Sequence, residues 1–203
     1  MNDFIKRIII ACWLLALSST IAFMFWKSEL QYNLPTPTPA NYAVVPPGYP
    51  INLASLADLK TNKPVFLHFF NPDCPCSRFN MTYFKTLLKK YNQQLNFAVV
   101  LVNKGKKWTE KEIQEKYELT IPVYSNNGIA SLCGVYSTPQ AAIIDREQKL
   151  FYRGNYNKSR YCTDKKTNYA QMAIDSILAN ASSPALNAAA FRGYGCVLPK
   201  CEK

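Results

Sequence analysis

The sequence predicts an α/β domain, with a mixed central sheet flanked by helices, behind an N-terminal membrane anchor. Three patterns carry this prediction: a long apolar run near the N-terminus, short apolar runs that alternate with amphipathic stretches, and two late apolar runs joined by a polar turn. The chain has 203 residues, of which 48% are hydrophobic. That is enough to build one core of ordinary size.

The N-terminal apolar run covers residues 8–26 and contains no charged side chain. A spanning helix needs about 20 such residues, whereas a cleaved signal peptide has an apolar region of only about 7–15. We therefore expect residues 1–27 to form a short cytoplasmic stub and an uncleaved transmembrane signal anchor. Lys6 and Arg7 precede the run, which predicts a cytoplasmic N-terminus. The expected location is the cell inner membrane, crossed once, with the domain facing the periplasm.

Three further segments follow the anchor. Residues 28–50 are expected to form a proline-rich linker, because six of the chain's 13 prolines lie within residues 34–50. Residues 51–180 form the expected folded domain. Residues 181–203 form an irregular tail that contains cysteines, which predicts that it is cross-linked and does not fray.

The expected domain alternates strands with helices and ends in a hairpin before a last helix, as in a mixed sheet with helices on its faces. A Thr109–Glu112 capping box marks the start of one of the helices. The expected strands are residues 64–70, 95–102, 121–124, 141–145 and 150–153. The expected helices are residues 77–94, 110–117, 128–133 and 165–180.

The chain is basic, with a formal net charge of +11. Its lysines and arginines are scattered along the sequence and form no long block, which is typical of solvated surfaces that keep a domain soluble. We therefore expect no nucleic-acid partner.

Two cysteines at the end of the first strand are the most informative residues of the domain. Cys74 and Cys76 flank Pro75 directly before an amphipathic helix. A helix N-terminus favours a thiolate, and Arg78 one turn further on would add to this effect. The neighbouring Asp73 would oppose it, unless its carboxylate points away. This position makes Cys74 the expected nucleophile of a thiol redox reaction.

A second motif, residues 133–145, reads Cys-Gly-Val-Tyr-Ser-Thr-Pro-Gln-Ala-Ala-Ile-Ile-Asp. A strand–cysteine–helix turn followed by this motif resembles the thioredoxin-like superfamily. Residues 51–179 look like its membrane-anchored, periplasmic thiol–disulfide reductases of the TlpA-like group, with a divergent Cys-Pro-Cys-Ser site. The resemblance implies that Cys74 attacks, that Ser77 replaces the usual resolving cysteine, and that Pro139 is a cis-proline that faces Cys74 and helps to hold an extended partner chain.

The residue that resolves a mixed disulfide on Cys74 stays open between two candidates. Cys76 would form a strained Cys-x-Cys ring, and strained disulfides are labile. Cys133 is the alternative, because the resemblance places its segment near the Pro139 loop.

Three other cysteines lie late in the chain, and we expect them to be structural: Cys162, Cys196 and Cys201. Together with the three above, six cysteines lie beyond the membrane run, and six thiols allow 15 complete pairings. We expect Cys196 to form a disulfide with either Cys162 or Cys201.

These observations predict an extracytoplasmic thiol–disulfide oxidoreductase that acts on protein thiols or disulfides without an organic cofactor. One alternative is a copper-binding metallochaperone or assembly factor of the same fold, with Cys74 and Cys76 holding Cu(I). Copper-delivery proteins of the superfamily add a distant histidine, whereas the one histidine here, His68, lies in an apolar strand and is expected in the core. Another alternative is a non-catalytic thioredoxin-like binding module.

Overall fold

A computed structural model of the chain describes residues 2–53, 59, 62–102, 107–159 and 161–198. The chain divides into two compact units, one up to Leu34 and one from Pro35 onwards.

The first unit contains one long helix, α1, which spans Asp3–Ser28 and is followed by a 3-10 turn, η1, at Leu30–Asn33. The helix has 26 residues and buries none of its side chains in the structure. Its length and apolar composition are sufficient to cross a membrane, and a signal sequence would meet the same two criteria. The expected long apolar helix is therefore present.

The second unit is built on a five-stranded sheet in the order β3-β2-β1-β5-β6. The central strand β1 runs parallel to β2 and antiparallel to β5, and β5 and β6 form an antiparallel hairpin. The strands are β1 Val65–Phe70, β2 Asn96–Leu101, β3 Val123–Tyr124, β5 Gln140–Ile144 and β6 Leu150–Gly154. This arrangement confirms the prediction of a mixed sheet, with β3 two residues shorter than expected.

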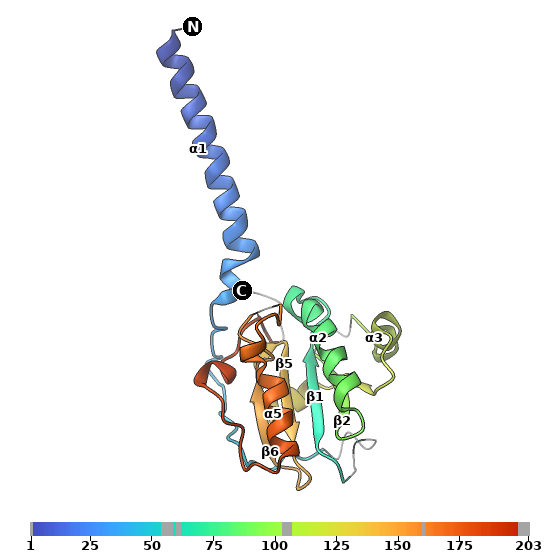
Figure 1. Cartoon of the computed structure of the whole chain (residues 1–203). Helices are drawn as coiled ribbons and strands as arrows, with labels where there is room; N and C mark the ends of the chain where they lie inside the picture. The colour runs from blue at the N-terminus through green and yellow to red at the C-terminus, as the bar shows by residue number, and fades with distance from the viewer. Residues whose placement is uncertain (1, 54–58, 60–61, 103–106, 160, 199–203) are drawn as a thin grey trace. The chain divides into compact units, whose positions relative to one another are not determined.

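Helices α2 (Pro75–Tyr91) and α5 (Tyr169–Leu178) pack together on one face of the sheet, as Figure 1 shows. Aromatic and aliphatic side chains from both helices and from the strands make up this core layer, in which Phe66 stacks on Phe84. Helix α3 (Glu110–Tyr117) adds Ile113 to the same layer. The predicted capping box of α3 is present.

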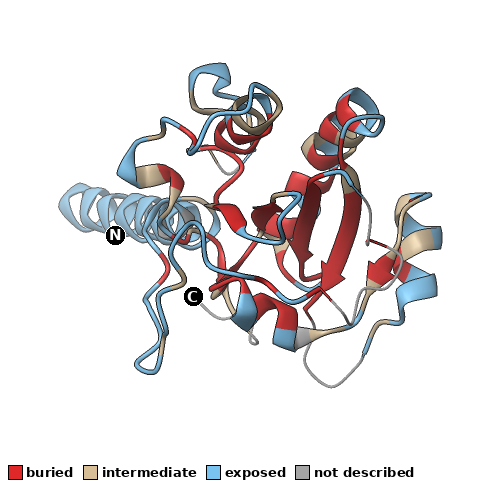
Figure 2. Ribbon diagram, turned by 90° about the horizontal axis from the view of Figure 1, so that it is seen from below, coloured by how far each residue is buried: buried red, intermediate tan, exposed pale blue. Residues whose placement is uncertain are grey.

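The opposite face of the sheet carries aliphatic side chains, which contact the short helix α4 (Asn127–Leu132) and the segment that leads into β1. Because both faces are covered, every residue of β1 is buried. Figure 2 shows the strands as the buried centre of this unit. The two layers hold the ends of β1 and β5 in fixed positions.

The expected last helix, residues 165–180, is divided in two. A 3-10 turn, η4, covers Lys165–Thr167, and α5 begins only at Tyr169. Asn168 separates them with a non-helical backbone, and its side chain accepts a hydrogen bond from Asn157. The local hydrogen bond therefore competes with the helix.

The boundaries of the unit also differ from those expected, because it begins at Pro35 and includes most of the expected linker. Tyr42 donates a hydrogen bond to the Gly134 carbonyl group, and Pro50 pairs with Lys149 beside the hairpin. The proline-rich segment is thus packed along the domain as part of its surface.

The tail belongs to the same unit and contains a 3-10 turn, η5 (Ala188–Ala190), and a short strand, β7 (Cys196–Val197). Strand β7 pairs antiparallel with β4 (Ser137–Thr138) to form a second, two-stranded sheet. The sequence patterns did not predict this small sheet.

Candidate active site

Cys74 occupies the N-cap of α2, directly after the turn that ends β1. The turn is held by Asn71, whose side chain accepts a hydrogen bond from the Asp73 backbone N–H and whose carbonyl group accepts one from the Cys74 N–H. Pro75 takes the first helical position, where its missing N–H is not needed. The backbone therefore places the Cys74 sulfur at the positive end of the helix dipole.

Pro139 follows a cis peptide bond from Thr138 at the start of β5, as the family resemblance implied. The Thr138 carbonyl oxygen lies 3.6 Å from the Cys74 sulfur. Pro139 therefore directly follows the residue whose carbonyl group lies beside the Cys74 sulfur.

Cys74 forms a disulfide with Cys196, 122 residues further along the chain, with 6.2 Å between the two Cα atoms. The expected pairing of Cys196 with Cys162 or Cys201 is wrong. The physical reason is the β4–β7 pairing, which sets Cys196 opposite Thr138 and so brings it to the Cys74 sulfur.

Backbone hydrogen bonds hold the tail against β4. The Leu198 N–H donates to the Tyr136 carbonyl oxygen at 3.0 Å, and the Gly193 N–H donates to the Tyr136 hydroxyl at 2.9 Å. From the other side, Thr36 donates its N–H to the Gly193 carbonyl oxygen at 2.7 Å and its hydroxyl to that of Gly195 at 3.0 Å. The tail is therefore bound between β4 and a residue of the expected linker.

The two other candidates for a redox partner of Cys74 lie elsewhere. Cys76 is buried in the first turn of α2, and Cys133 is buried at the C-cap of α4. Both are thiols in the structure. Burial raises the pKa of Cys133 to about 12, although the charge of Arg153 acts in the opposite direction. The structure thus joins Cys74 to neither of the two residues proposed to resolve it.

Of the remaining cysteines expected to be structural, Cys162 is a partly buried thiol in the loop before η4. Its sulfur accepts a hydrogen bond from the Asn80 side chain at 3.2 Å. Burial raises the pKa of Cys162 to about 11, and the hydrogen bond from Asn80 opposes that shift. Cys201 lies outside the described residues.

The carboxylate of Asp73 contacts two side chains outside the Cys74 turn. One of its oxygens accepts hydrogen bonds from the Lys107 ammonium group at 3.3 Å and from the Trp108 indole N–H at 3.2 Å. The ion pair with Lys107 balances the negative charge next to Cys74 in the sequence.

His68 is a core residue, as expected. Its Nδ1 atom lies 2.7 Å from the Tyr156 hydroxyl, and its ring stacks on Phe84 with 4.4 Å between centroids. Complete burial lowers its pKa to about 3, so the ring is neutral at physiological pH. Within the described part of the chain, no group of three or more His, Cys, Asp or Glu side chains is arranged to hold a metal ion.

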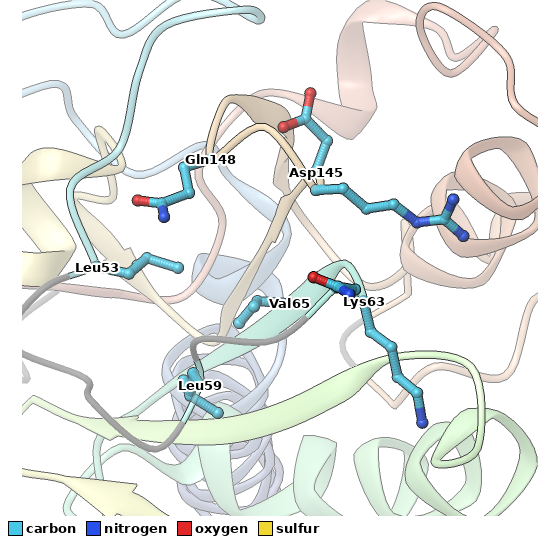
Figure 3. Close-up of a pocket in the computed structure, with 8 residues that line it drawn as sticks. Leu53, Leu59, Lys63, Val65, Asp145 and Gln148 are labelled. Carbon is cyan, nitrogen blue, oxygen red and sulfur yellow. The ribbon is translucent and has the colours of Figure 1, made fainter.

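A pocket lies at the opposite end of the sheet, near the start of β1 and the end of β5 (Figure 3). It has a volume of about 310 Å³ and is lined by Leu53, Leu59, Asn62, Lys63, Val65, Asp145, Arg146 and Gln148. It contains no thiol, so it is separate from the Cys74–Cys196 site.

The comparisons with known proteins agree with this fold. The model of the family described as "Domain of unknown function (DUF6436)" matches residues 51–199, so the chain belongs to that family. No curated protein matches the sequence.

Solved structures share the fold at low sequence identity. A hypothetical protein from Sinorhizobium meliloti 1021 has a TM-score of 0.63 and 18% identity, covering 77% of this chain and 96% of its own. An uncharacterized conserved protein from Geobacillus kaustophilus has a TM-score of 0.61 and 17% identity, covering 81% and 98%. A thioredoxin-like protein in the oxidized form has a TM-score of 0.49 and 16% identity, covering 75% and 99%. The domain has the thioredoxin-like architecture predicted from its two motifs, with a mixed sheet, a cysteine at the N-terminus of α2 and a cis-proline beside it.

Proposed function

We propose that this protein is a thiol–disulfide oxidoreductase that acts on thiols or disulfides of other proteins. The observation that carries the proposal is the Cys74–Cys196 disulfide, which joins a helix N-terminus to a strand paired beside the cis-proline loop. A disulfide in this position is the oxidised form of a redox pair.

Cys74 is the attacking residue in this proposal. Its sulfur lies at the helix N-terminus, where the thiolate is favoured, and the thiolate is the nucleophile in disulfide exchange. Cys196 is the second member of the pair and takes the role that sequence patterns had left open between Cys76 and Cys133. The high pKa and the burial of Cys133 make it a poor attacking group.

The reaction balances with these two cysteines alone. In the reducing direction, the Cys74 thiolate attacks one sulfur of a client disulfide, and the other client sulfur leaves as a thiolate. The Cys196 thiolate then attacks the Cys74 sulfur and releases the second client thiolate. Two electrons pass to the client, and the Cys74–Cys196 disulfide forms. The reverse sequence oxidises a client dithiol.

The proposal includes the location expected from the sequence: a single-pass anchor in the inner membrane, with the domain in the periplasm. Helix α1 supports it by its length and composition, and Lys6 near its start supports a cytoplasmic N-terminus. The disulfide also supports it, because such bonds persist in oxidising compartments. Protein clients, exchange without a metal or organic cofactor, and the absence of a nucleic-acid partner remain part of the proposal.

The test is disulfide exchange with a protein substrate, measured on the full chain in detergent micelles. We expect Cys74→Ser to lose the exchange entirely, and the matched variant Cys162→Ser to keep it. Cys196→Ser should accumulate a mixed disulfide between Cys74 and the substrate, detectable by non-reducing electrophoresis, because the resolving thiol is missing. Cys76→Ser and Cys133→Ser should not accumulate it.

Other outcomes would support the alternative functions. Full exchange activity in Cys74→Ser would refute Cys74 as the attacking residue, and with it the proposed mechanism. Stoichiometric Cu(I) uptake that is lost in both Cys74→Ser and Cys76→Ser would indicate a copper carrier. A chain with neither activity would be a binding module.

A further inference from the structure

The tail strand, residues 193–198, lies where an external substrate of Cys74 would have to lie. Within it, Cys196–Val197 form β7, which pairs antiparallel with β4, and Cys196 is joined to Cys74. This is the geometry of a mixed disulfide between an enzyme and a bound peptide, formed here within one chain.

We propose that clients bind along β4, at the position that the tail strand occupies in this structure. We further propose that clients are extended segments in which a glycine directly precedes the reactive cysteine. The proposal rests on the oxidoreductase function above and specifies its substrate class. It also implies that, in the oxidised protein, a client strand can pair with β4 only when Cys196 and its strand have been displaced from Cys74.

The β4 edge binds the tail through main-chain hydrogen bonds. Strand β4 has only two residues, yet its pairing with β7 sets Ser137 opposite Val197 and Thr138 opposite Cys196. The Leu198 N–H extends the ladder to the Tyr136 carbonyl group. Main-chain pairing of this kind gives affinity without reading the sequence, and side-chain positions then give specificity.

Glycine is required because the tail backbone approaches β4 very closely. A Cβ atom on Gly195 would overlap the Thr138 carbonyl oxygen, and Gly195 also has a φ of +117°. A Cβ atom on Gly193 would lie 2.6 Å from the Ser137 hydroxyl oxygen and would meet the Tyr136 ring. A client seated in the same register meets the same groups, so the residue before its cysteine must be glycine.

Two further features beside β4 would suit a client peptide that replaces the tail strand. The Ser137 and Thr138 hydroxyl oxygens are buried and make no hydrogen bond with the described residues, so the edge keeps polar atoms available to another occupant. Leu198 lines a pocket of about 400 Å³ beside Tyr42 and Val135. This pocket would accept an apolar residue two positions after a client's cysteine.

During exchange, a client segment replaces the tail strand on β4. A client thiolate attacks the Cys74 sulfur, the Cys74–Cys196 bond breaks, and Cys196 leaves as a thiolate together with its strand. The client then occupies β4 as a mixed disulfide. A second client thiolate releases it as a disulfide and leaves both protein cysteines reduced.

The test uses the full-length Cys196→Ser chain in detergent and two synthetic peptides, Gly-Tyr-Gly-Cys-Val-Leu and Gly-Tyr-Ala-Cys-Val-Leu. Each carries a thiopyridyl disulfide on its cysteine, so attack by Cys74 joins the peptide to the protein and releases pyridinethione, which absorbs light. Mass spectrometry identifies the modified cysteine. We expect the glycine peptide to react with Cys74 at least about tenfold faster, because the alanine methyl group must overlap β4.

Two controls separate the possible results. Both peptides should react equally fast with glutathione, and neither should modify position 74 in the Cys74→Ser, Cys196→Ser double variant. Equal rates for the two peptides at Cys74 would overturn the glycine requirement and leave the oxidoreductase intact. A Cys74 that reacts with neither peptide nor with oxidised glutathione would overturn the oxidoreductase, and the client proposal with it.

Discussion

The β4 edge and the apolar layer under α4 each lie beside a cysteine, but they give the two cysteines opposite environments. At the edge, Cys74 lies at a helix N-terminus, beside the Thr138 carbonyl group, and is joined to a segment from the far end of the chain. Under α4, Cys133 packs among aliphatic side chains, and burial raises its pKa to about 12.

The difference shows that spacing in the sequence alone does not decide which cysteines form a disulfide in this fold. Cys76 is two residues from Cys74 and Cys196 is 122 residues away, yet Cys196 is the partner. A helix end and a backbone edge supply the electrostatics and the approach path that exchange requires, whereas an apolar layer supplies neither. We therefore expect the two regions to differ by orders of magnitude in thiol reactivity.

The largest expected effect is in alkylation of the reduced chain. The pKa of Cys133 is raised from 9.0 to about 12, so its thiolate at pH 8 should be about a thousandfold scarcer than that of an ordinary cysteine. We expect iodoacetamide to modify Cys74 rapidly and Cys133 hardly at all. Because the pKa is raised, Cys133 labelling should increase about tenfold per pH unit towards pH 11. Differential labelling with mass spectrometry measures both sites.

The unfolded chain provides the control for this prediction. In denaturant, the helix end and the apolar layer no longer exist, so the two cysteines should label at similar rates. Equal rates in the folded protein at pH 8 would remove the distinction between the two regions.

The local chemistry of the edge was predictable from the sequence. A buried strand that ends at a cysteine before a proline-initiated helix fixes the position of Cys74, and the resemblance carried by the Thr-Pro motif implied the cis bond at Pro139. The core position of His68 followed from the apolar run around it. Each of these features depends on residues that are close together in the sequence.

The partner of Cys74 was not predictable in the same way. Strands β4 and β7 have two residues each, too few to show a period of two. The Gly-x-Gly-Cys sequence at residues 193–196 was the available signal, because glycines beside a cysteine can mark a close backbone approach.

The expected linker shows the same limit. Its prolines indicate an extended linker. An extended chain still carries donors at its other residues, and Thr36 uses both of its donors to bind the tail. Its contacts are with residues about 160 positions away, which no local pattern can report.

A smaller effect is expected from a substitution that disturbs the β4–β7 pairing within the intact chain. Gly195→Ala should weaken the docking of the tail strand, because the new methyl group would overlap the Thr138 carbonyl oxygen. Titration against glutathione redox buffers measures the equilibrium of the Cys74–Cys196 disulfide. We expect the variant to be reduced about tenfold more readily than the unmodified protein.

Gly48→Ala is the matched control, because Gly48 also has a positive φ, of +82°, but no atom within 4 Å of its Cβ position. Both substitutions therefore strain the backbone, and only one disturbs the β4 edge. If the two variants shift the disulfide equilibrium equally, general destabilisation explains the effect and the edge has no special role. If only Gly195→Ala shifts it, the strand pairing itself stabilises the disulfide, and the reactivity of Cys74 depends on which strand occupies β4.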